Sequence, residues 1–265
     1  MDEIKRINYD RILEIISDKG FDSDHLTKDY YLTVILYLIK DIEGLYFKGG
    51  TALQKIFLNY SRLSEDLDFT LTRDVKEIIK EIEERIKSNL FTRITKDKDV
   101  EGFTRLVVYY RDFSDKESFV FIDLNKRAKL STKPEKYAIK HFYKDNIPEF
   151  SVNTLSKEEM IAEKMAAAIA RNRPRDHYDL YKIIKSGIKI NINLVKEKCK
   201  QSNIEFNIIK MFNKANILKN RWDKDLVPLI SENISFQTVM KTLSHYFKLK
   251  EEKNKLKNNK GNFKV

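Results

Sequence analysis

Two adjacent glycines, Gly49 and Gly50, stand between a short apolar segment, Leu45–Phe47, and a segment of helical periodicity, Thr51–Leu58. Because glycine carries no side chain, such a pair lets the chain turn tightly from a strand into a helix. The amides that open the helix have no partner within it and favour an anion such as phosphate. The Gly-Lys-Ser/Thr ending of a Walker loop is absent. The pattern therefore predicts a strand–turn–helix unit, which is either an anion site or an ordinary turn.

Two acids, Asp66 and Asp68, lie two residues apart at the start of the next expected strand. Since strand side chains alternate, both carboxylates lie on one face while Leu67 and Phe69 point into the core. Neighbouring carboxylates repel each other, and a divalent cation offsets that repulsion. Their oxygen ligands favour Mg²⁺ or Mn²⁺. The alternative is a pair of solvated acids at a strand end.

A third acid, Asp123, ends the apolar run Phe119–Ile122. An ionised carboxylate in so apolar a strand is costly unless it is paired or bound to a metal. The alternative is an aspartate that caps the following loop. If the glycine turn and the three acids come together, they surround one site for phosphate and metal.

The two halves of the chain differ in pattern. In the first, helices are expected at 24–40 and 75–87, and strands at 67–71, 103–110 and 118–124. The second is mostly helical: Ser156 and Glu159 form a capping box, and Pro174 fits the first position of a further helix. These patterns predict an α/β domain over 1–155 and a helical domain over 156–265, whose Lys/Asn-rich end, 255–265, we expect to be disordered.

Charged residues recur at helical spacing in two consecutive helices of the second half. Lys164 and Arg171 are seven residues apart and share one helix face. Asp176 and Asp179 share a face of the next helix. Arg175 belongs to a group of three arginines that can grip phosphates in bidentate fashion. The alternatives are a helical salt bridge, an acid at the helix dipole and a solvated lysine.

The chain has 51 Lys and Arg against 40 Asp and Glu, a formal net charge of +11. The excess lies in three segments, 124–144, 164–185 and 241–265. Two stretches of these segments, 124–144 and 241–257, fit a track for an RNA backbone. Tyr137, Phe142 and Tyr143 lie among the lysines of the first segment, where they could stack on bases. The alternative is a solvated lysine-rich surface whose aromatic rings face the core.

Composition excludes several classes of protein. The single cysteine, Cys199, excludes an internal disulfide and a thiolate zinc cluster, and four scattered histidines argue against a histidine metal site. No window approaches the roughly 18 uninterrupted apolar residues of a membrane span. The charged N-terminus lacks the apolar core of a signal peptide. We therefore expect a protein of the reducing cytoplasm.

Together these motifs resemble a known superfamily. Gly49-Gly50-Thr51 followed by Asp66-Leu67-Asp68-Phe69 looks like the signature of the polymerase-β-like nucleotidyltransferases. More narrowly, the Lys-Gly-Gly-Thr-Ala-Leu run at 48–53 and the Arg-Leu-Ser-Glu-Asp-Leu-Asp-Phe run at 62–69 resemble the AbiEii/AbiGii group, which are toxins of toxin–antitoxin pairs. The similarity spans 45–185. It implies an α+β fold in which a nucleotidyltransferase domain, a mixed sheet flanked by helices, precedes a C-terminal helical bundle.

The resemblance also implies residue roles. An NTP would be held by the glycine-motif backbone and hydroxyl, that is by Gly49, Gly50 and Thr51. Two Mg²⁺ or Mn²⁺ ions would be bound by the three acids, Asp66, Asp68 and Asp123, and the third acid would help to activate the attacking hydroxyl. Further nucleotide-binding residues would come from the charged helices: Lys164, Arg171, Arg175 and Asp176.

The activity implied is transfer of an NMP from an NTP to a hydroxyl, with release of pyrophosphate. The expected acceptor is RNA, possibly the 3′ end of a tRNA, and the expected partner is a cognate antitoxin. Two alternatives stay open on the sequence. One is transfer to a small hydroxyl compound such as an aminoglycoside, and the other is a non-catalytic RNA- or protein-binding module on the same fold.

Overall fold

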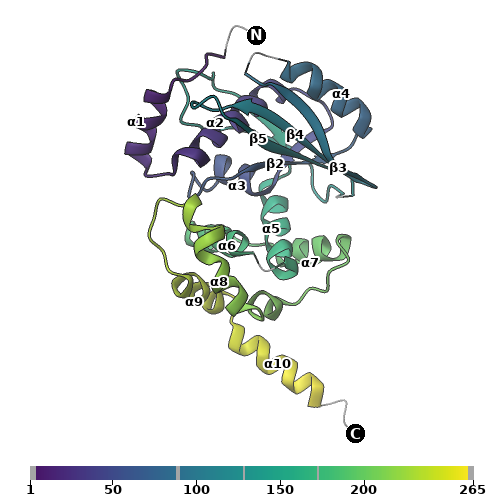
Figure 1. The fold of residues 1–265 in the computed structure, drawn as a ribbon. Helices are drawn as coiled ribbons and strands as arrows, with labels where there is room; N and C mark the ends of the chain where they lie inside the picture. Colours follow the sequence, from purple (N-terminus) through teal and green to yellow (C-terminus); the bar gives the residue numbers. More distant parts are fainter. Residues whose placement is uncertain (1–3, 88–89, 128, 172, 262–265) are drawn as a thin grey trace. The chain divides into compact units, whose positions relative to one another are not determined.

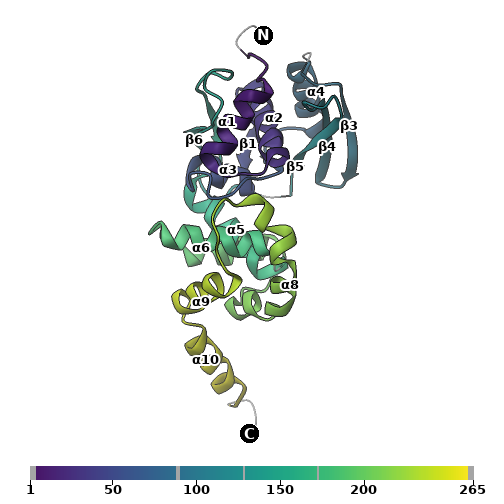
Figure 2. The ribbon, with the colours of Figure 1, turned by 60° about the vertical axis from the view of Figure 1, so that its left-hand side comes forward.

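The computed structural model describes residues 4–87, 90–127, 129–171 and 173–261. The chain divides into two compact units (Figures 1 and 2). Unit 1 comprises the residues up to Met160 together with Leu229–Ser231, and unit 2 comprises Ile161–Pro228 and the residues from Glu232 onward. The division falls inside a helix, five residues after the expected boundary at 155. Two independent domains stay a prediction.

Unit 1 combines helices and strands, as the first half of the sequence predicts. Its helices are α1 (Tyr9–Lys19), α2 (Ser23–Ile39), α3 (Gly49–Ile56) and α4 (Val75–Ile86). Its strands are β1 (Leu45–Lys48), β2 (Asp66–Leu71), β3 (Arg93–Val100), β4 (Phe103–Arg111), β5 (Glu117–Asn125), β6 (Glu135–Ala138) and β7 (Ser151–Thr154). Helix α5 (Lys157–Arg171) begins in this unit and continues into unit 2.

The seven described strands form one mixed sheet in the order β3-β4-β5-β2-β1-β7-β6. The pairs β2–β5 and β1–β7 are parallel, and the other pairs are antiparallel. Helix α2 packs against β5 and α4 (Figure 1). The α+β class and the mixed sheet flanked by helices are thus confirmed.

The alternation of the central strands gives the sheet two different faces. Residues of β2, β4 and β5 such as Leu67, Leu106 and Ile122 are fully buried on one face. Their neighbours Asp66, Arg105 and Phe121 point to the opposite face, because successive strand residues alternate. We call this second face the acid face, and define it by Asp66, Asp68 and Asp123.

Unit 2 is built from helices. They are α6 (Pro174–Lys185), α7 (Ile192–Gln201), α8 (Ala215–Asp225), α9 (Phe236–Tyr246) and α10 (Leu249–Gly261), with 3-10 turns at Ile208–Phe212 and Val227–Leu229. Pro174 occupies the first turn of α6, as expected.

Helix α10 reaches Gly261, and 262–265 lie outside the described residues. The disorder expected over 255–265 stays a prediction. An ion pair one turn apart, Glu252–Lys255, supports this helix. A bundle stays a prediction.

The capping box at Ser156 is only half formed. The Ser156 hydroxyl accepts the Glu159 amide at 3.2 Å. The Glu159 carboxylate does not reach back; it accepts the amides of Ser131 and Thr132 at 2.9 and 3.0 Å. A buried carboxylate takes the donors that surround it, and here a loop supplies them.

Unit 1 also includes a short segment from far along the chain. The Leu63 amide donates to the carbonyl of Leu229 at 2.8 Å. Leu63 is buried and lies three residues before β2. A loop from the C-terminal part of the chain thus supplies a hydrogen-bond acceptor to the segment that leads into β2.

Candidate active site

The glycine turn brings Asp68 against the first turn of α3. Gly49 has φ +80°, in the left-handed region that favours glycine, and a Cβ there would collide with the Asp68 carboxylate. A Cβ on Gly50 would lie 2.6 Å from Nη2 of Arg62, whose side chain is buried. Each glycine therefore leaves room for one charged group at the helix start, a carboxylate at Gly49 and a guanidinium at Gly50.

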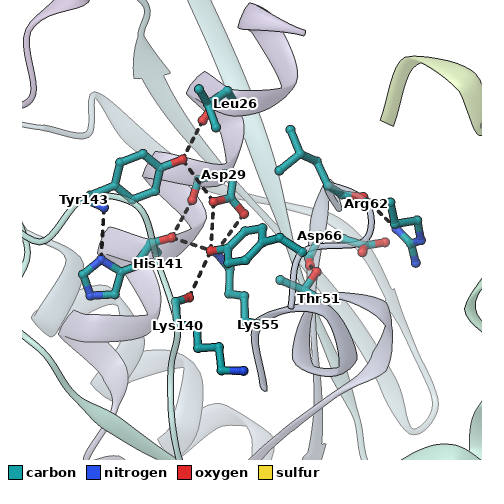
Figure 3. A network of polar contacts seen from close by, with 12 residues as sticks. Leu26, Asp29, Thr51, Lys55, Arg62, Asp66, Lys140, His141 and Tyr143 are labelled. Carbon is teal, nitrogen blue, oxygen red and sulfur yellow. Dashed lines mark hydrogen bonds and ion pairs between the residues drawn. The ribbon is translucent and has the colours of Figure 1, made fainter. Parts of the chain in front are cut away.

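Thr51 joins α3 to the acid strand. Its buried hydroxyl donates to the backbone carbonyl of Asp66 (Figure 3). This bond positions the residue that opens β2. A contact of the Thr51 hydroxyl with the nucleotide stays a prediction.

Four charged residues form one row across the acid face. Lys48 of β1 opposes Asp68 of β2, Asp68 is in register with Asp123 of β5, and Asp123 opposes Arg105 of β4. Residues in register on neighbouring strands share a face and lie close together. The expected grouping of Asp68 with Asp123 therefore follows from strand register, and Asp66 joins them two residues along β2.

Asp123 is bound by a residue that the sequence reasoning missed. Nε and Nη2 of Arg105 each donate to one oxygen of Asp123, both at 2.7 Å. These bonds raise the pKa of Arg105. The guanidinium also lies 4.5 Å from the ring centroid of Phe121. The signal was available, because Arg105 interrupts the apolar strand β4 as Asp123 interrupts β5.

The donor set fits a divalent cation only in part. Asp66 and Asp68 supply hard carboxylate oxygens on one strand face, as Mg²⁺ requires. Among the described residues, however, no group of three His, Cys, Asp or Glu side chains is arranged to hold a metal. Asp123 accepts both bonds of Arg105, one on each oxygen, and each oxygen keeps a second lone pair that could bind a metal.

A buried polar network supports the helix that carries the glycine turn (Figure 3). Nζ of Lys55, near the end of α3, lies 2.7 Å from Asp29 of α2 and donates to Thr33 at 2.9 Å and Tyr60 at 2.6 Å. Asp29 also accepts the hydroxyl of Tyr143 at 3.0 Å. Burial lowers the pKa of Lys55, while the Asp29 charge opposes that shift. The network fixes α3 against α2. It thereby holds in place the helix at whose start the glycine turn lies.

Of the predicted stacking residues of the 124–144 segment, Tyr143 is buried, while Tyr137 and Phe142 are half-buried. Tyr143 is buried and donates to Asp29 and to the Leu26 carbonyl. Phe142 packs on Tyr60 with ring centroids 4.2 Å apart, and Tyr137 meets Phe57 edge-on at 4.9 Å. The alternative in which the rings face the core holds for Tyr143. Base stacking by the half-buried Tyr137 and Phe142 stays a prediction.

The charged helices of unit 2 form a closed ion-pair cluster. Nζ of Lys164 lies 3.0 Å from both Asp176 and Asp179, and its side chain is only 6% exposed. Arg171 donates from Nε and Nη2 to Asp176 at 2.8 and 3.0 Å. Burial by itself would raise the pKa of Asp176, but Lys164 and Arg171 hold it well below its usual value. The predicted shared faces are observed, with Lys164 turned inward.

Arg175 lies half-buried on α6, one residue after Pro174. The structure thus brings six predicted site residues together in unit 1, namely Gly49, Gly50, Thr51, Asp66, Asp68 and Asp123. It brings Lys164, Arg171 and Asp176 together in unit 2. As nucleotide contacts, Lys164, Arg171, Arg175 and Asp176 stay predictions.

Residues 32–242 match the family model described as "Nucleotidyl transferase AbiEii toxin, Type IV TA system". The chain belongs to the AbiEii family. This family member is therefore a nucleotidyltransferase of a toxin family, as the glycine turn and the acid pair indicate. The match includes both the acid face of unit 1 and the ion-pair cluster of unit 2.

Solved structures share the fold of this AbiEii chain. The nucleotidyltransferase toxin MenT4 from Mycobacterium tuberculosis H37Rv is 19% identical with a TM-score of 0.69, over 91% of this chain and 89% of that one. JHP933 from Helicobacter pylori is 18% identical with a TM-score of 0.61, over 91% and 98% of the two chains. A putative nucleotidyltransferase from H. pylori is 20% identical with a TM-score of 0.60, over 90% and 98%. A comparison with curated proteins found no match.

None of the helices that the structure describes is long and apolar enough to cross a membrane.

Proposed function

We propose that this AbiEii-family chain transfers a nucleoside monophosphate from an NTP to a hydroxyl of an RNA acceptor, with Mg²⁺ or Mn²⁺ as its metal. The observation that carries the proposal is the packing of the Asp68 carboxylate against Gly49, at the first turn of α3. A phosphate at a helix start and a cation at paired carboxylates can thus occupy adjacent positions. That adjacency is what a metal-bound triphosphate requires.

The roles of the residues follow from their places on the acid face. The first-turn amides of α3 would bind phosphate oxygens, and Asp66 and Asp68 would hold the metal, which when bound stabilises charge on the phosphoryl oxygens. Thr51 holds β2 at Asp66 through its hydroxyl. Lys48 and Arg105 end the charge row, and Arg105 holds the carboxylate of Asp123 in place. We keep two ions and a metal-binding Asp123 as the expectation from the family.

Labelled nucleotides test this function. The purified chain is incubated with total RNA, Mg²⁺ and each of the four α-labelled NTPs in turn. We expect one NTP to label an RNA band, with no label in the Asp66→Asn variant. Absence of transfer from all four, in conditions where a related toxin labels RNA, contradicts the proposal. Transfer to an aminoglycoside instead of RNA selects the small-molecule alternative.

Toxicity and an antitoxin partner are tested separately. We expect expression of the chain to arrest growth and Asp68→Asn to relieve the arrest at equal protein level. A cognate antitoxin, encoded by a neighbouring gene, should restore growth with the wild-type chain. Equal growth arrest by the Asp68→Asn variant would contradict a toxicity that depends on nucleotidyl transfer.

A further inference from the structure

The acid face continues into a cluster of aromatic rings. Tyr109 of β4 opposes Phe119 of β5, and their ring centroids lie 6.0 Å apart. Phe119 and Phe121 follow each other on the same face at 5.1 Å. Phe119 is 43% exposed, which is unusual for a phenylalanine in the middle of a strand. We call these three residues the ring platform.

Cations are interleaved with the platform. The guanidinium carbon of Arg93, on the edge strand β3, lies 3.4 Å from the centroid of Tyr109, and that of Arg105 lies 4.5 Å from Phe121. Arg93 is half exposed and also pairs with Glu117 at 2.8 Å. Rings with arginines beside them present stacking surfaces and positive charge on the same face. Unpaired nucleotides take both, since bases stack on rings and phosphates meet cations.

Strand register joins the platform directly to the acids. Phe121 is in register with Asp66, and it lies two residues, about 7 Å, before Asp123 on β5. A chain of nucleotides lying on the rings would therefore end at the proposed metal site. An exposed sheet face bearing two or three rings is a form of single-strand recognition that needs no groove.

We propose that the ring platform binds the unpaired terminal nucleotides of the acceptor RNA by stacking and leads the terminal hydroxyl toward Asp66 and Asp68. This proposal rests on the function proposed above and assigns the acceptor to a surface of unit 1. This surface is different from the track expected over 124–144, in which Tyr143 is buried. Duplex RNA, with its bases already stacked, gains nothing from the platform.

The test measures binding without NTP, so that it does not depend on catalysis. The probe is a fluorescent 12-nucleotide RNA without secondary structure, compared with a blunt 12-base-pair RNA duplex, both in Mg²⁺. We expect Phe119→Leu, which keeps an apolar side chain but removes the ring, to weaken single-strand binding on the order of tenfold. Duplex binding should change less than about twofold. Phe119→Trp should retain the wild-type affinity.

A matched control comes from α1. Tyr9 is 47% exposed and lies outside the sheet, so Tyr9→Leu should leave the affinity for the single strand unchanged. A 2-aminopurine near the RNA end should lose fluorescence on binding to the wild type and not to Phe119→Leu. Melting temperatures of all variants check that each is folded.

Three outcomes would overturn the inference. If Phe119→Leu and Tyr9→Leu weaken single-strand RNA binding equally, the platform has no specific role in that binding. Loss of NTP affinity with intact RNA affinity assigns the rings to the nucleotide base. A wild-type dimer that Phe119→Leu dissociates makes the face an interface between two copies. If the labelled-NTP panel fails while the platform variants still weaken RNA binding, the proposed transfer is wrong and the binding surface stands.

Discussion

The charged residues predicted from the sequence lie in two clusters of aspartates, one in each unit. On the acid face, Asp66 and Asp68 are half-buried beside a glycine turn. In unit 2, Asp176 and Asp179 are buried around Lys164. The first cluster lies on an accessible sheet face, where a cation can be exchanged with solvent. The second contains its own cations, a buried Lys164 and a half-exposed Arg171. Similar spacings of acids and bases thus give a half-buried acid pair in one case and a buried ion-pair cluster in the other.

The largest expected effect separates catalysis from stability on the acid face. Asp68→Asn keeps the side-chain volume but removes one carboxylate charge from the proposed metal site. We expect turnover to fall on the order of 10³-fold, while the free energy of unfolding changes by less than about 1 kcal/mol. Initial rates with the labelled NTP and urea unfolding provide the two numbers. Retained turnover combined with a large loss of stability would make this cluster structural as well.

The second prediction applies the same comparison to unit 2. Lys164→Met leaves two buried carboxylates facing each other, so we expect a loss of about 3 kcal/mol in unfolding free energy. Urea denaturation followed by circular dichroism measures it. Lys248→Met, at an exposed ion pair with Glu251, is the control and should cost less than about 1 kcal/mol. If Lys164→Met has normal stability and no turnover, the lysine acts on the nucleotide.

The third prediction concerns the polar network of unit 1, which is buried like the ion-pair cluster of unit 2. Burial and the nearby Lys55 lower the pKa of His141 to about 4. Between about pH 6.5 and 4 the unfolded chain binds a proton at this residue that the folded chain does not, so stability falls as pH falls. From pH 7 to pH 5 we expect His141 to account for a loss of about 2 kcal/mol.

The variant His141→Gln isolates this contribution. Its unfolding free energy should decrease less between pH 7 and pH 5 than that of the wild type, in urea titrations at both values. Identical pH slopes for the two proteins would show that His141 titrates normally. Any pH dependence of stability would then have to come from other titratable groups, such as those of the acid face.

The smallest expected effect tests the end of the charge row. Arg105→Lys keeps the positive charge but loses the two parallel bonds to Asp123. We expect turnover to fall about tenfold with little change in stability, because Asp123 is then held less well. A faster enzyme would instead mean that Arg105 competes with the metal for Asp123. Initial rates over a range of Mg²⁺ concentrations distinguish these results.

Sequence patterns predicted the parts of the fold that carry strong periodicity. Helices α2 and α4 and strands β2, β4 and β5 appear within about two residues of their expected ranges. Strand β3 was missed because its side chains are mostly exposed and charged, and β6 and β7 because four residues are too few for a periodic signal. Helix α1 was also missed. Its apolar residues Ile12 and Ile15 are spaced as a helix requires, but only over three turns.

For the site, spacing predicted which residues share a face but not which partners they have. The joint position of Asp66, Asp68 and the glycine turn follows from alternation and one tight turn. The pairing of Asp123 with Arg105 depends on strand register, which no local pattern encodes. The inward turn of Lys164 depends on how two helices pack. The inferences that failed were those that needed tertiary partners.

The return of Leu229–Ser231 to unit 1 bears on how this protein can be dissected. A fragment ending at Met160 lacks the carbonyl that accepts the Leu63 amide, three residues before the acid strand. Such a fragment would expose that amide and loosen the entrance to β2, even though it contains every residue of the acid face. A gene fragment that encodes the first 160 residues would thus lack Leu229–Ser231, which is encoded about 70 codons later. We therefore expect the two units to be stable only when they are expressed together in one chain.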